Sequence, residues 1–174
     1  MERLKRFDTV TSKWILSWPS RWQSLLAGIT FLGEPWIVLA IAAGGLVSAA
    51  ASNQQALEWA FIWAGTAYGI NTLIKQITRR RRPHNRRISM LGIRSYSFPS
   101  GHAFGSLVFY GLYANLVYRH LSFPADFAVL SALAVIVILI GVSRVSLGTH
   151  YPTDVVGGWL LGSVSLYLIV WLVL

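Results

Sequence analysis

Five long stretches without a charged side chain limit what this chain can fold into. A helix needs about 17–25 mostly apolar residues to cross a bilayer, and the first and last stretches reach this length directly. The others reach it when the third begins near Ser100 and when the second and fourth gain a flanking turn. The stretches cover residues 35–57, 59–74, 95–118, 127–143 and 155–174. We therefore predict an all-α integral membrane helical bundle with about five transmembrane helices, at residues 35–52, 57–76, 100–118, 126–143 and 153–173.

The alternative is a soluble helical bundle with a very apolar core. Hydrophobic residues make up 55% of the chain and charged residues 12%, against about 25% charged residues in soluble domains. Helices on the surface of a soluble protein also need a polar outer face, which these stretches lack. The composition therefore favours a membrane protein.

The first 33 residues have a different character. Basic residues alternate with Trp and Leu, and Pro19 interrupts the segment. This pattern is typical of helices that lie in the membrane interface. We interpret residues 1–33 as an amphipathic interfacial segment and residues 34–174 as the membrane-embedded domain. A sixth span is cramped, because residues 14–51 would have to cross the membrane twice in 38 residues.

Small residues recur four positions apart inside two of the predicted spans. Gly101 and Gly105 form one such pair, and Gly158 and Gly162 form the other. This spacing places both glycines of a pair on one helix face, where it permits a close approach of a second helix. We expect these faces to be sites of helix packing.

Ionisable side chains at the ends of spans are costly in a membrane protein and therefore indicate function. Counting crossings puts the end of the second span, the start of the third, the end of the fourth and the start of the fifth on one membrane face. Cations, histidines and a carboxylate are expected to converge there: Lys75, Arg82, His102, Arg144, His150 and Asp154. The opposite face carries only Glu58, Arg119, His120 and Asp126.

Each of these features also has an ordinary explanation. The arginine-rich run at 79–87 is typical of a patch that binds nucleic acid or anionic lipid. His102 at a helix start suits a cap or a packed polar residue, and His150 and Asp154 are spaced as a helix surface pair. Their coincidence on one face, with a net charge of +9, favours a site for an anion over these separate explanations.

The chemistry that these residues permit is phosphoryl transfer. Arginine and lysine neutralise phosphate oxygens, and free amides at Ser100 and Gly101 suit an anion at a helix start. One histidine can attack phosphorus while the other protonates the leaving oxygen, and Asp154 can fix the tautomer of one ring. Two histidines and an aspartate can also bind a metal, but the neighbouring cations would repel it. The chain has no cysteine, which leaves out thiolate chemistry and Cys-ligated metals.

Three motifs occur in order: Lys75-x6-Arg82-Pro83, Pro99-Ser100-Gly101-His102 and Ser143-Arg144-x5-His150-x3-Asp154. Together they resemble the signature of the type-2 phosphatidic acid phosphatase superfamily. That superfamily includes bacterial lipid phosphate phosphatases and vanadium haloperoxidases. The resemblance covers about residues 28–174 and leaves the interfacial N-terminus unexplained.

The resemblance implies a role for each motif residue. His150 would be the nucleophile that forms a phosphohistidine, Asp154 would orient it, and His102 would be the general acid. The remaining motif residues would bind the phosphate oxygens, with no metal or other cofactor needed: Lys75, Arg82, Ser100, Gly101 and Arg144. Residues 34–174 would then be a phosphatase domain.

The implied substrates are lipid phosphates or diphosphates: phosphatidate, phosphatidylglycerophosphate, undecaprenyl diphosphate or the 1-phosphate of lipid A. A nucleic-acid partner is not expected, because such a protein would not need five apolar spans. The competing function is an anion transporter or channel that uses the same cationic cluster without hydrolysis. The other arginines of this face would bind a second phosphate or the membrane surface: Arg79, Arg80, Arg81, Arg86, Arg87 and Arg94.

The two indications of membrane orientation disagree. The five-span arrangement puts fourteen of the fifteen Lys and Arg residues on the active face, with only Arg119 opposite. The positive-inside rule would place that face in the cytoplasm. The resemblance to bacterial lipid phosphatases implies a multi-pass protein of the inner membrane with a periplasmic active face. Because phosphate binding accounts for part of the positive charge, we favour the periplasmic face.

Overall fold

The computed structural model describes residues 2–83 and 95–174. Over these ranges the chain forms seven α-helices and one short 3₁₀ helix, η1, and no strand. In chain order they are α1 (Glu2–Leu16), α2 (Ser20–Ile29), η1 (Thr30–Gly33), α3 (Pro35–Ala51), α4 (Gln55–Thr78), α6 (Gly101–His120), α7 (Ala125–Ser146) and α8 (Pro152–Val173).

Five helices, α3, α4, α6, α7 and α8, lie where the sequence predicts them, and their ends agree with the predicted ends within three residues. Local signals explain several of these ends. Proline opens α3 and α8, where its missing N–H costs nothing. The Ser100 side chain accepts the Ala103 N–H at the start of α6, as an N-cap does.

The membrane-facing character differs among these helices. By length and composition, α7 and α8 can each cross a membrane. The segments Ser20–Gly33 and Pro35–Ala51 meet at a bend of 42°, and together they are a third candidate if they form one span. Large apolar side chains are exposed along both α7 and α8, among them Val135, Ile138, Leu160 and Val164. Such faces suit lipid rather than water, which argues against the soluble bundle. The crossing of α4 and α6 stays a prediction.

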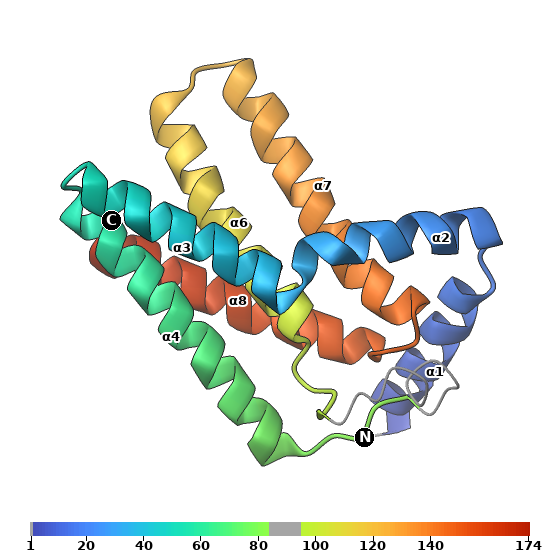
Figure 1. The fold of residues 1–174 in the computed structure, drawn as a ribbon. Coiled ribbons are helices and arrows are strands. Elements are labelled where there is room, and N and C mark those ends of the chain that lie inside the picture. Colours follow the sequence, from blue (N-terminus) through green and yellow to red (C-terminus); the bar gives the residue numbers. More distant parts are fainter. Residues whose placement is uncertain (1, 84–94) are drawn as a thin grey trace.

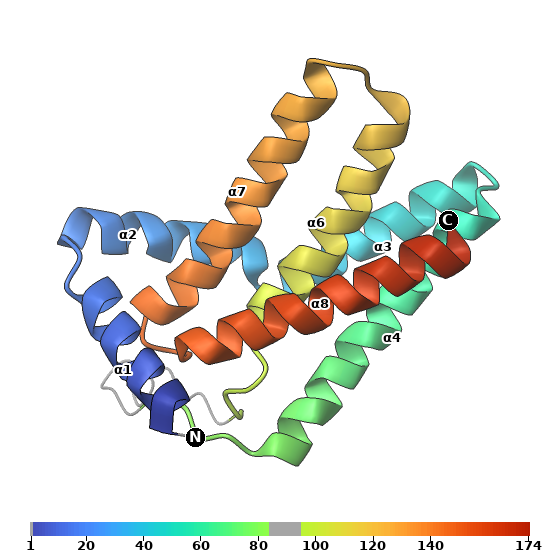
Figure 2. The same cartoon turned by 180° about the vertical axis from the view of Figure 1, so that it is seen from behind.

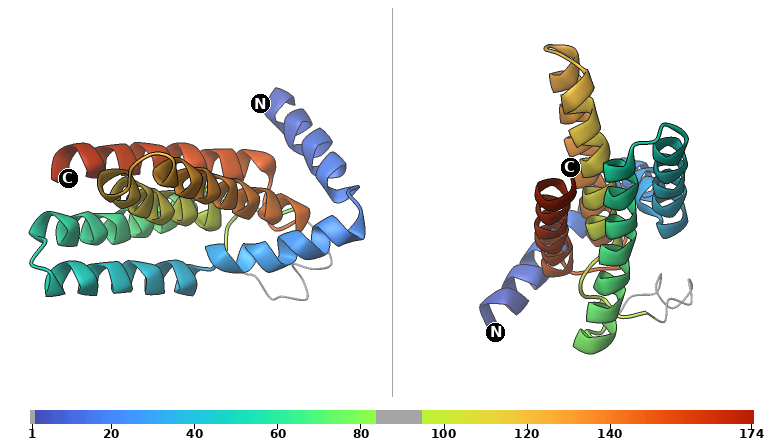
Figure 3. Two further views of the ribbon diagram at one scale, coloured as in Figure 1. Left: turned by 90° about the horizontal axis from the view of Figure 1, so that it is seen from above. Right: turned by 90° about the vertical axis from the view of Figure 1, so that its left-hand side faces the viewer.

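Helix α6 is the centre of the bundle. It packs against α3, α4, α7, α8 and η1. The α6–α7 hairpin rises from the group of α3, α4 and α8 (Figures 1 and 3). Seen from behind, α8 runs across α6, and the C-terminus lies beside the turn between α3 and α4 (Figure 2). This arrangement gathers the end of α4, the start of α6, the end of α7 and the start of α8 at one end of the molecule.

The Gly158–Gly162 pair permits a close contact between α8 and α6. A Cβ atom added at Gly158 of α8 would lie 2.7 Å from the Ser100 carbonyl oxygen, and one at Gly162 would lie 3.2 Å from the Phe104 carbonyl oxygen. Backbone therefore meets backbone where α6 and α8 cross, as small-residue interfaces allow. This contact fixes the start of α6 relative to the start of α8.

The N-terminal helices pack on the outside of the bundle. Helix α1 contacts α7 and α8, and α2 contacts α7. Within α1 only Asp8 and Ile15 are buried, while Leu4, Phe7 and Trp14 are exposed. The location of this segment in the membrane interface stays a prediction.

We expect Gly158→Ala to destabilise the protein by about 1–3 kcal/mol, the usual cost of overpacking, because its methyl group would meet backbone that cannot move aside. Gly65→Ala in α4 is the matched control, since nothing lies within 4 Å of a Cβ at that position. The thermal midpoint of the detergent-solubilised protein measures both effects. Equal midpoints for the two variants would show that α6 and α8 are not in backbone contact.

Candidate active site

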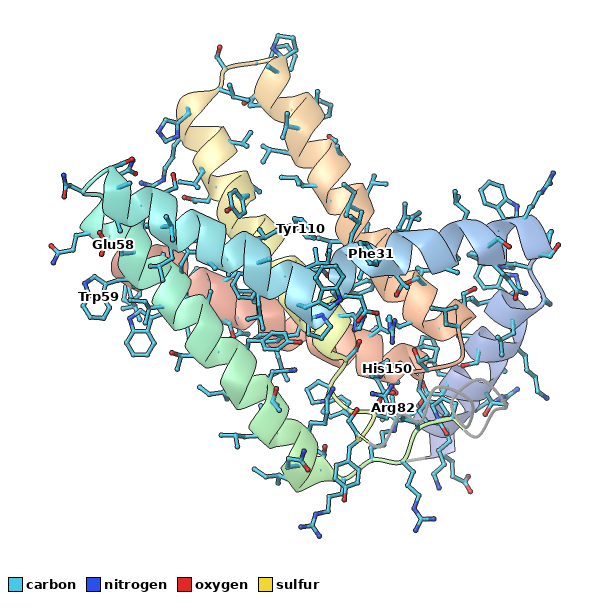
Figure 4. All side chains as sticks on the ribbon, in the orientation of Figure 1. Phe31, Glu58, Trp59, Arg82, Tyr110 and His150 are labelled. Atoms are coloured by element: carbon cyan, nitrogen blue, oxygen red, sulfur yellow. The ribbon has the colours of Figure 1, made fainter. Side chains whose placement is uncertain are left out.

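A cavity of about 460 Å³ opens at the gathered helix ends. Side chains from the start of α3, from α4, from both ends of the α6–α7 hairpin and from three connecting segments line it. Figure 4 shows His150 and Arg82 together at this end, far from Glu58 and Trp59. The polar residues that line the cavity are Thr30, Glu34, Tyr68, Lys75, Arg82, Ser95, His102, Arg144, Thr149 and His150, and Gly101 is also at its wall.

His150 lies in the short connection between α7 and α8 and is 2% exposed. The connection is tied back onto α7, because the amides of Thr149 and His150 both donate to the Arg144 carbonyl oxygen at 3.0 and 3.2 Å. Gly148 makes the turn with a φ of 64°, in the left-handed region that glycine adopts without strain. The local backbone therefore holds the imidazole in one place.

The two ring nitrogens of His150 face groups of opposite charge. Nε2 lies 3.2 Å from Nη1 of Arg82, and Nδ1 lies 3.6 Å from Oδ2 of Asp154. Since a guanidinium only donates, Nε2 must accept, and the proton of the neutral ring is then on Nδ1 facing the carboxylate. This tautomer leaves the Nε2 lone pair on the cavity side.

His150 is neutral in this environment. Burial lowers its pKa to about 3; the Asp154 carboxylate opposes this shift, and the charges of Arg82 and Arg144 add to it. A neutral imidazole keeps the lone pair that a nucleophile needs.

Asp154, on the first turn of α8, is fully buried behind His150. Its Oδ2 accepts hydrogen bonds from the Tyr151 amide at 2.8 Å and from the Ser97 hydroxyl. Its Oδ1 accepts one from Nη1 of Arg80 at 2.6 Å. The carboxylate is thus held from three directions, with Oδ2 turned toward the Nδ1 of His150.

His102, on the first turn of α6, pairs with a carboxylate that the motifs do not include. Its Nε2 lies 3.2 Å from Oε1 of Glu34, the residue that directly precedes α3. The hydrogen bond with His102 lowers the pKa of Glu34, and the charges of His102 and Arg144 act in the same direction. The carboxylate is therefore ionised at neutral pH and can stabilise a protonated His102.

All three cations that were predicted to bind phosphate line the cavity: Lys75, Arg82 and Arg144. Nη1 of Arg144 donates to the Thr30 hydroxyl at 2.7 Å, and its Nε is buried without a partner. A Cβ placed on Gly101 would lie 3.6 Å from Nζ of Lys75. An anion in the cavity would therefore meet several charged donors at once.

Ser100 and Asp154 differ from the other predicted site residues, because neither lines the cavity. The Ser100 hydroxyl caps α6, and its amide donates to the Asp154 carbonyl oxygen at 3.0 Å. Ser100 therefore joins α6 to α8 in this structure. Its predicted contact with phosphate stays a prediction.

The remaining arginines have different environments. Arg80 bridges Asp154 and Asp8, whereas Nε of the exposed Arg79 donates to the Gln76 carbonyl oxygen. Arg86, Arg87 and Arg94 lie outside the described residues. In the described ranges no three His, Cys, Asp or Glu side chains are grouped so as to hold a metal ion.

The sequence reasoning missed several polar partners, among them Asp8, Thr30, Glu34 and Ser97. Asp8 and Thr30 lie in the segment that we interpreted only as interfacial. Glu34 carried one usable signal, since it is a carboxylate at the start of an apolar span. Ser97 lies two residues before the second motif and had none.

The fold and the site together define a helical membrane protein with a cation-lined cavity at one end. The PAP2 superfamily profile matches residues 56–174, and the chain belongs to this superfamily, as the motifs predicted.

Curated relatives agree with this assignment. Phosphatidylglycerophosphatase B of Bacillus subtilis is 36% identical over 107 residues, 60% of this chain and 52% of that protein. The match therefore spans about half the length of that relative. Decaprenylphosphoryl-5-phosphoribose phosphatase of Mycobacterium tuberculosis is 32% identical over 143 residues, 78% of this chain and 72% of that protein.

Two crystal structures have the same fold. The transmembrane PAP2-type phosphatidylglycerolphosphate phosphatase of Bacillus subtilis matches with a TM-score of 0.78 and 28% identity, over 99% of this chain and 87% of that one. LpxE of Aquifex aeolicus matches with a TM-score of 0.68 and 15% identity over 93% of each chain, a likeness that concerns the fold alone. The prediction of an all-α integral membrane bundle is confirmed.

The buried neutral state of His150 predicts a loss of stability in acid. The pKa of an unperturbed histidine is 6.5 and that of His150 is about 3, so between these values the unfolded chain binds more protons. The contribution of His150 to stability is therefore complete above the higher value and is lost as the pH falls toward the lower one. We expect the thermal midpoint to fall between about pH 7.5 and 4.5, and His150→Gln to reduce that fall.

His120→Gln serves as the control, because His120 is exposed at the opposite end of the molecule. The same acid-induced drop in the wild type and in His150→Gln would show that His150 is not buried in its neutral form.

Proposed function

We propose that the protein is a metal-independent lipid phosphatase, which hydrolyses a phosphomonoester or diphosphate of a membrane lipid through a phosphohistidine at His150. The observation that supports this most is the placement of the two nitrogens of His150. Nε2 faces the arginine-lined cavity, and Nδ1 faces a buried carboxylate.

In the first step the Nε2 lone pair attacks phosphorus and the bond from phosphorus to the lipid oxygen breaks. The leaving oxygen takes a proton from His102, and Asp154 stabilises the positive charge on the phosphorylated ring through Nδ1–H. In the second step water attacks phosphorus and gives a proton to His102, and the P–N bond breaks. Inorganic phosphate leaves, and both histidines return to their starting states.

The cations and Glu34 assist different parts of this reaction. Lys75, Arg82 and Arg144 neutralise the phosphoryl oxygens, whose charge shifts in the transition state. Glu34 supports the protonated form of His102 before the leaving group accepts the proton. An anion transporter would need the cations, but it would gain nothing from the His150–Asp154 pair beside His102.

The separate roles of the two histidines predict a dependence on the leaving group. An alkoxide leaves poorly without a proton, whereas the aryl group of p-nitrophenyl phosphate leaves well. We expect His102→Ala to lose about 10²–10⁴-fold on a lipid phosphate, the usual contribution of a general acid, and to keep measurable activity on the aryl ester. His150→Ala should lose both activities.

The decisive quantity is the ratio of aryl to lipid turnover in each purified variant. A proportional loss of both activities in both variants would remove the support for this assignment, and the reverse pattern would exchange the two roles. Wild-type protein that binds the lipid but releases no phosphate would favour the transporter. Loss of activity in excess EDTA with rescue by magnesium would contradict the metal-independent mechanism.

Relatives help to choose among the implied lipids. The names of the two curated relatives describe substrates in which a phosphoryl group links the lipid to glycerol or ribose, and this glycerol or ribose carries a second phosphate. We propose a substrate of this type, phosphatidylglycerophosphate, ahead of phosphatidate, undecaprenyl diphosphate and lipid A 1-phosphate. Phosphate release from these four lipids in matched detergent micelles tests the order, and a higher kcat/KM for undecaprenyl diphosphate would overturn it.

We further propose that the active end faces the periplasm from a bacterial inner membrane. Because the chain has no cysteine, single cysteines can report the orientation. Gln76→Cys lies near the active end and Ser52→Cys at the opposite turn, both at exposed positions. In intact cells a membrane-impermeant maleimide should label Gln76→Cys, and Ser52→Cys only after permeabilisation. The opposite pattern would place the active end in the cytoplasm.

A further inference from the structure

Arg80 occupies a closely fitted position between two carboxylates. Nη1 donates to Oδ1 of Asp154, and Nη2 to Oδ2 of Asp8, both at 2.6 Å. Nη1 also lies 2.7 Å from the Thr153 hydroxyl, and the guanidinium lies 4.5 Å from the centre of the Tyr151 ring. Its planar fork offers a separate nitrogen to each carboxylate in a fixed geometry, whereas lysine has a single nitrogen on a flexible stem.

Asp8 is the far end of this arrangement and the only buried polar residue of α1. It is 3% exposed. Its Oδ1 accepts the Thr153 amide at 2.9 Å, and its Oδ2 accepts the Thr153 hydroxyl at 2.8 Å. Asp8 therefore satisfies a free N–H on the first turn of α8, where a negative charge is also favoured by the helix dipole. Helix α1 is joined to α8 one residue from Asp154.

The two carboxylate oxygens of Asp154 contact different groups. Oδ1 contacts Arg80, while Oδ2 accepts from Ser97 and Tyr151 and faces Nδ1 of His150. With Oδ1 held by Arg80, Oδ2 is directed at the imidazole. Neither Asp8 nor Arg80 lines the cavity, so neither can bind the phosphate directly.

We infer that Asp8 and Arg80 are positioning residues for catalysis, which act on His150 through Asp154, and that α1 is thereby part of the active-site assembly. The inference rests on the proposed roles of His150 and Asp154. Asp8 lies outside the residues matched by the superfamily profile, which begin at position 56. This role for Asp8 also gives a function to the N-terminal segment, which the motifs leave unexplained.

Asp8→Asn tests this with little change in shape. The amide oxygen can still accept the Thr153 N–H, but the amide nitrogen cannot accept from Arg80 and leaves it with one carboxylate. We expect kcat on p-nitrophenyl phosphate and on lipid phosphate to fall by about tenfold or more, since a misplacement of about 1 Å can cost 10²-fold. KM should change less than about twofold, because the phosphate-binding cations are untouched.

A second background separates positioning from a purely structural role. If Asp8 acts through Asp154, then Asp8→Asn should lower kcat no further in Asp154→Asn protein, measured as residual aryl phosphate turnover. Non-additivity of this kind marks residues that act as one unit. Asp126→Asn, at the opposite end of the molecule, is the matched control and should leave kcat and KM unchanged. Thermal midpoints of all variants check that the fold is retained.

Arg80→Lys provides an independent route if Asp8→Asn does not fold. Lysine keeps the charge but lacks the rigid fork that fixes both carboxylates, so kcat should fall with KM preserved. An unchanged kcat in both Asp8→Asn and Arg80→Lys, a rise in KM alone, or an equal loss in the Asp154→Asn background would overturn the inference. Failure of the proposed mechanism is distinguishable, because it appears as retained turnover in His150→Ala.

Discussion

A fully buried carboxylate, that of Asp154, is the constraint on which the rest of the site depends. A buried ionised group is tolerated only when charges and hydrogen bonds replace the water that it has lost. Here the replacements are a backbone amide, the Ser97 hydroxyl and the Arg80 guanidinium. These donors come from the α7–α8 connection and from segments next to α4 and α6. Satisfying this one charge therefore brings the three motifs together.

The same requirement extends to the N-terminal helix. Arg80 is itself partly buried and is balanced by Asp8 as well as by Asp154. A chain of alternating charges thus runs from α1 through Arg80 and Asp154 to His150. The second histidine has a simpler support, since Glu34 at the start of α3 holds His102. Both histidines are consequently oriented by carboxylates, and residues before position 35 contribute to both arrangements.

Helix packing sets the distance between these two halves of the site. His102 begins α6 and His150 precedes α8, and these helices cross with their backbones in contact at Gly158 and Gly162. A bulkier interface would separate the general acid from the nucleophile. The glycines that suit close packing in a membrane therefore also determine the geometry of the proposed reaction.

Sequence reasoning reached the helices and the motif residues for different reasons. Uncharged stretches predict helix positions because the bilayer restricts length and polarity, and counting crossings then places Lys75, His102 and His150 at one end. It could not identify Asp8 or Thr30, because each pairs with a residue more than sixty positions away and belongs to no local pattern. Glu34 had a local signal as a carboxylate at the start of an apolar span, but its pairing with His102 is equally distant in the sequence. Sequence reasoning assigned Ser100 to the phosphate, which stays a prediction; the capping of α6 by its hydroxyl is a second use that suits a serine at a helix start.

The most direct test of the central claim is to trap the phosphorylated enzyme. Phosphohistidine survives alkali and is hydrolysed in acid, so a radiolabelled lipid phosphate can be mixed with the protein and quenched in alkali within the first turnover. The account predicts an acid-labile label that mass spectrometry of the digested protein places on His150, and no label in His150→Ala. A label on His102, or full turnover with no labelled protein at any time, would contradict the account.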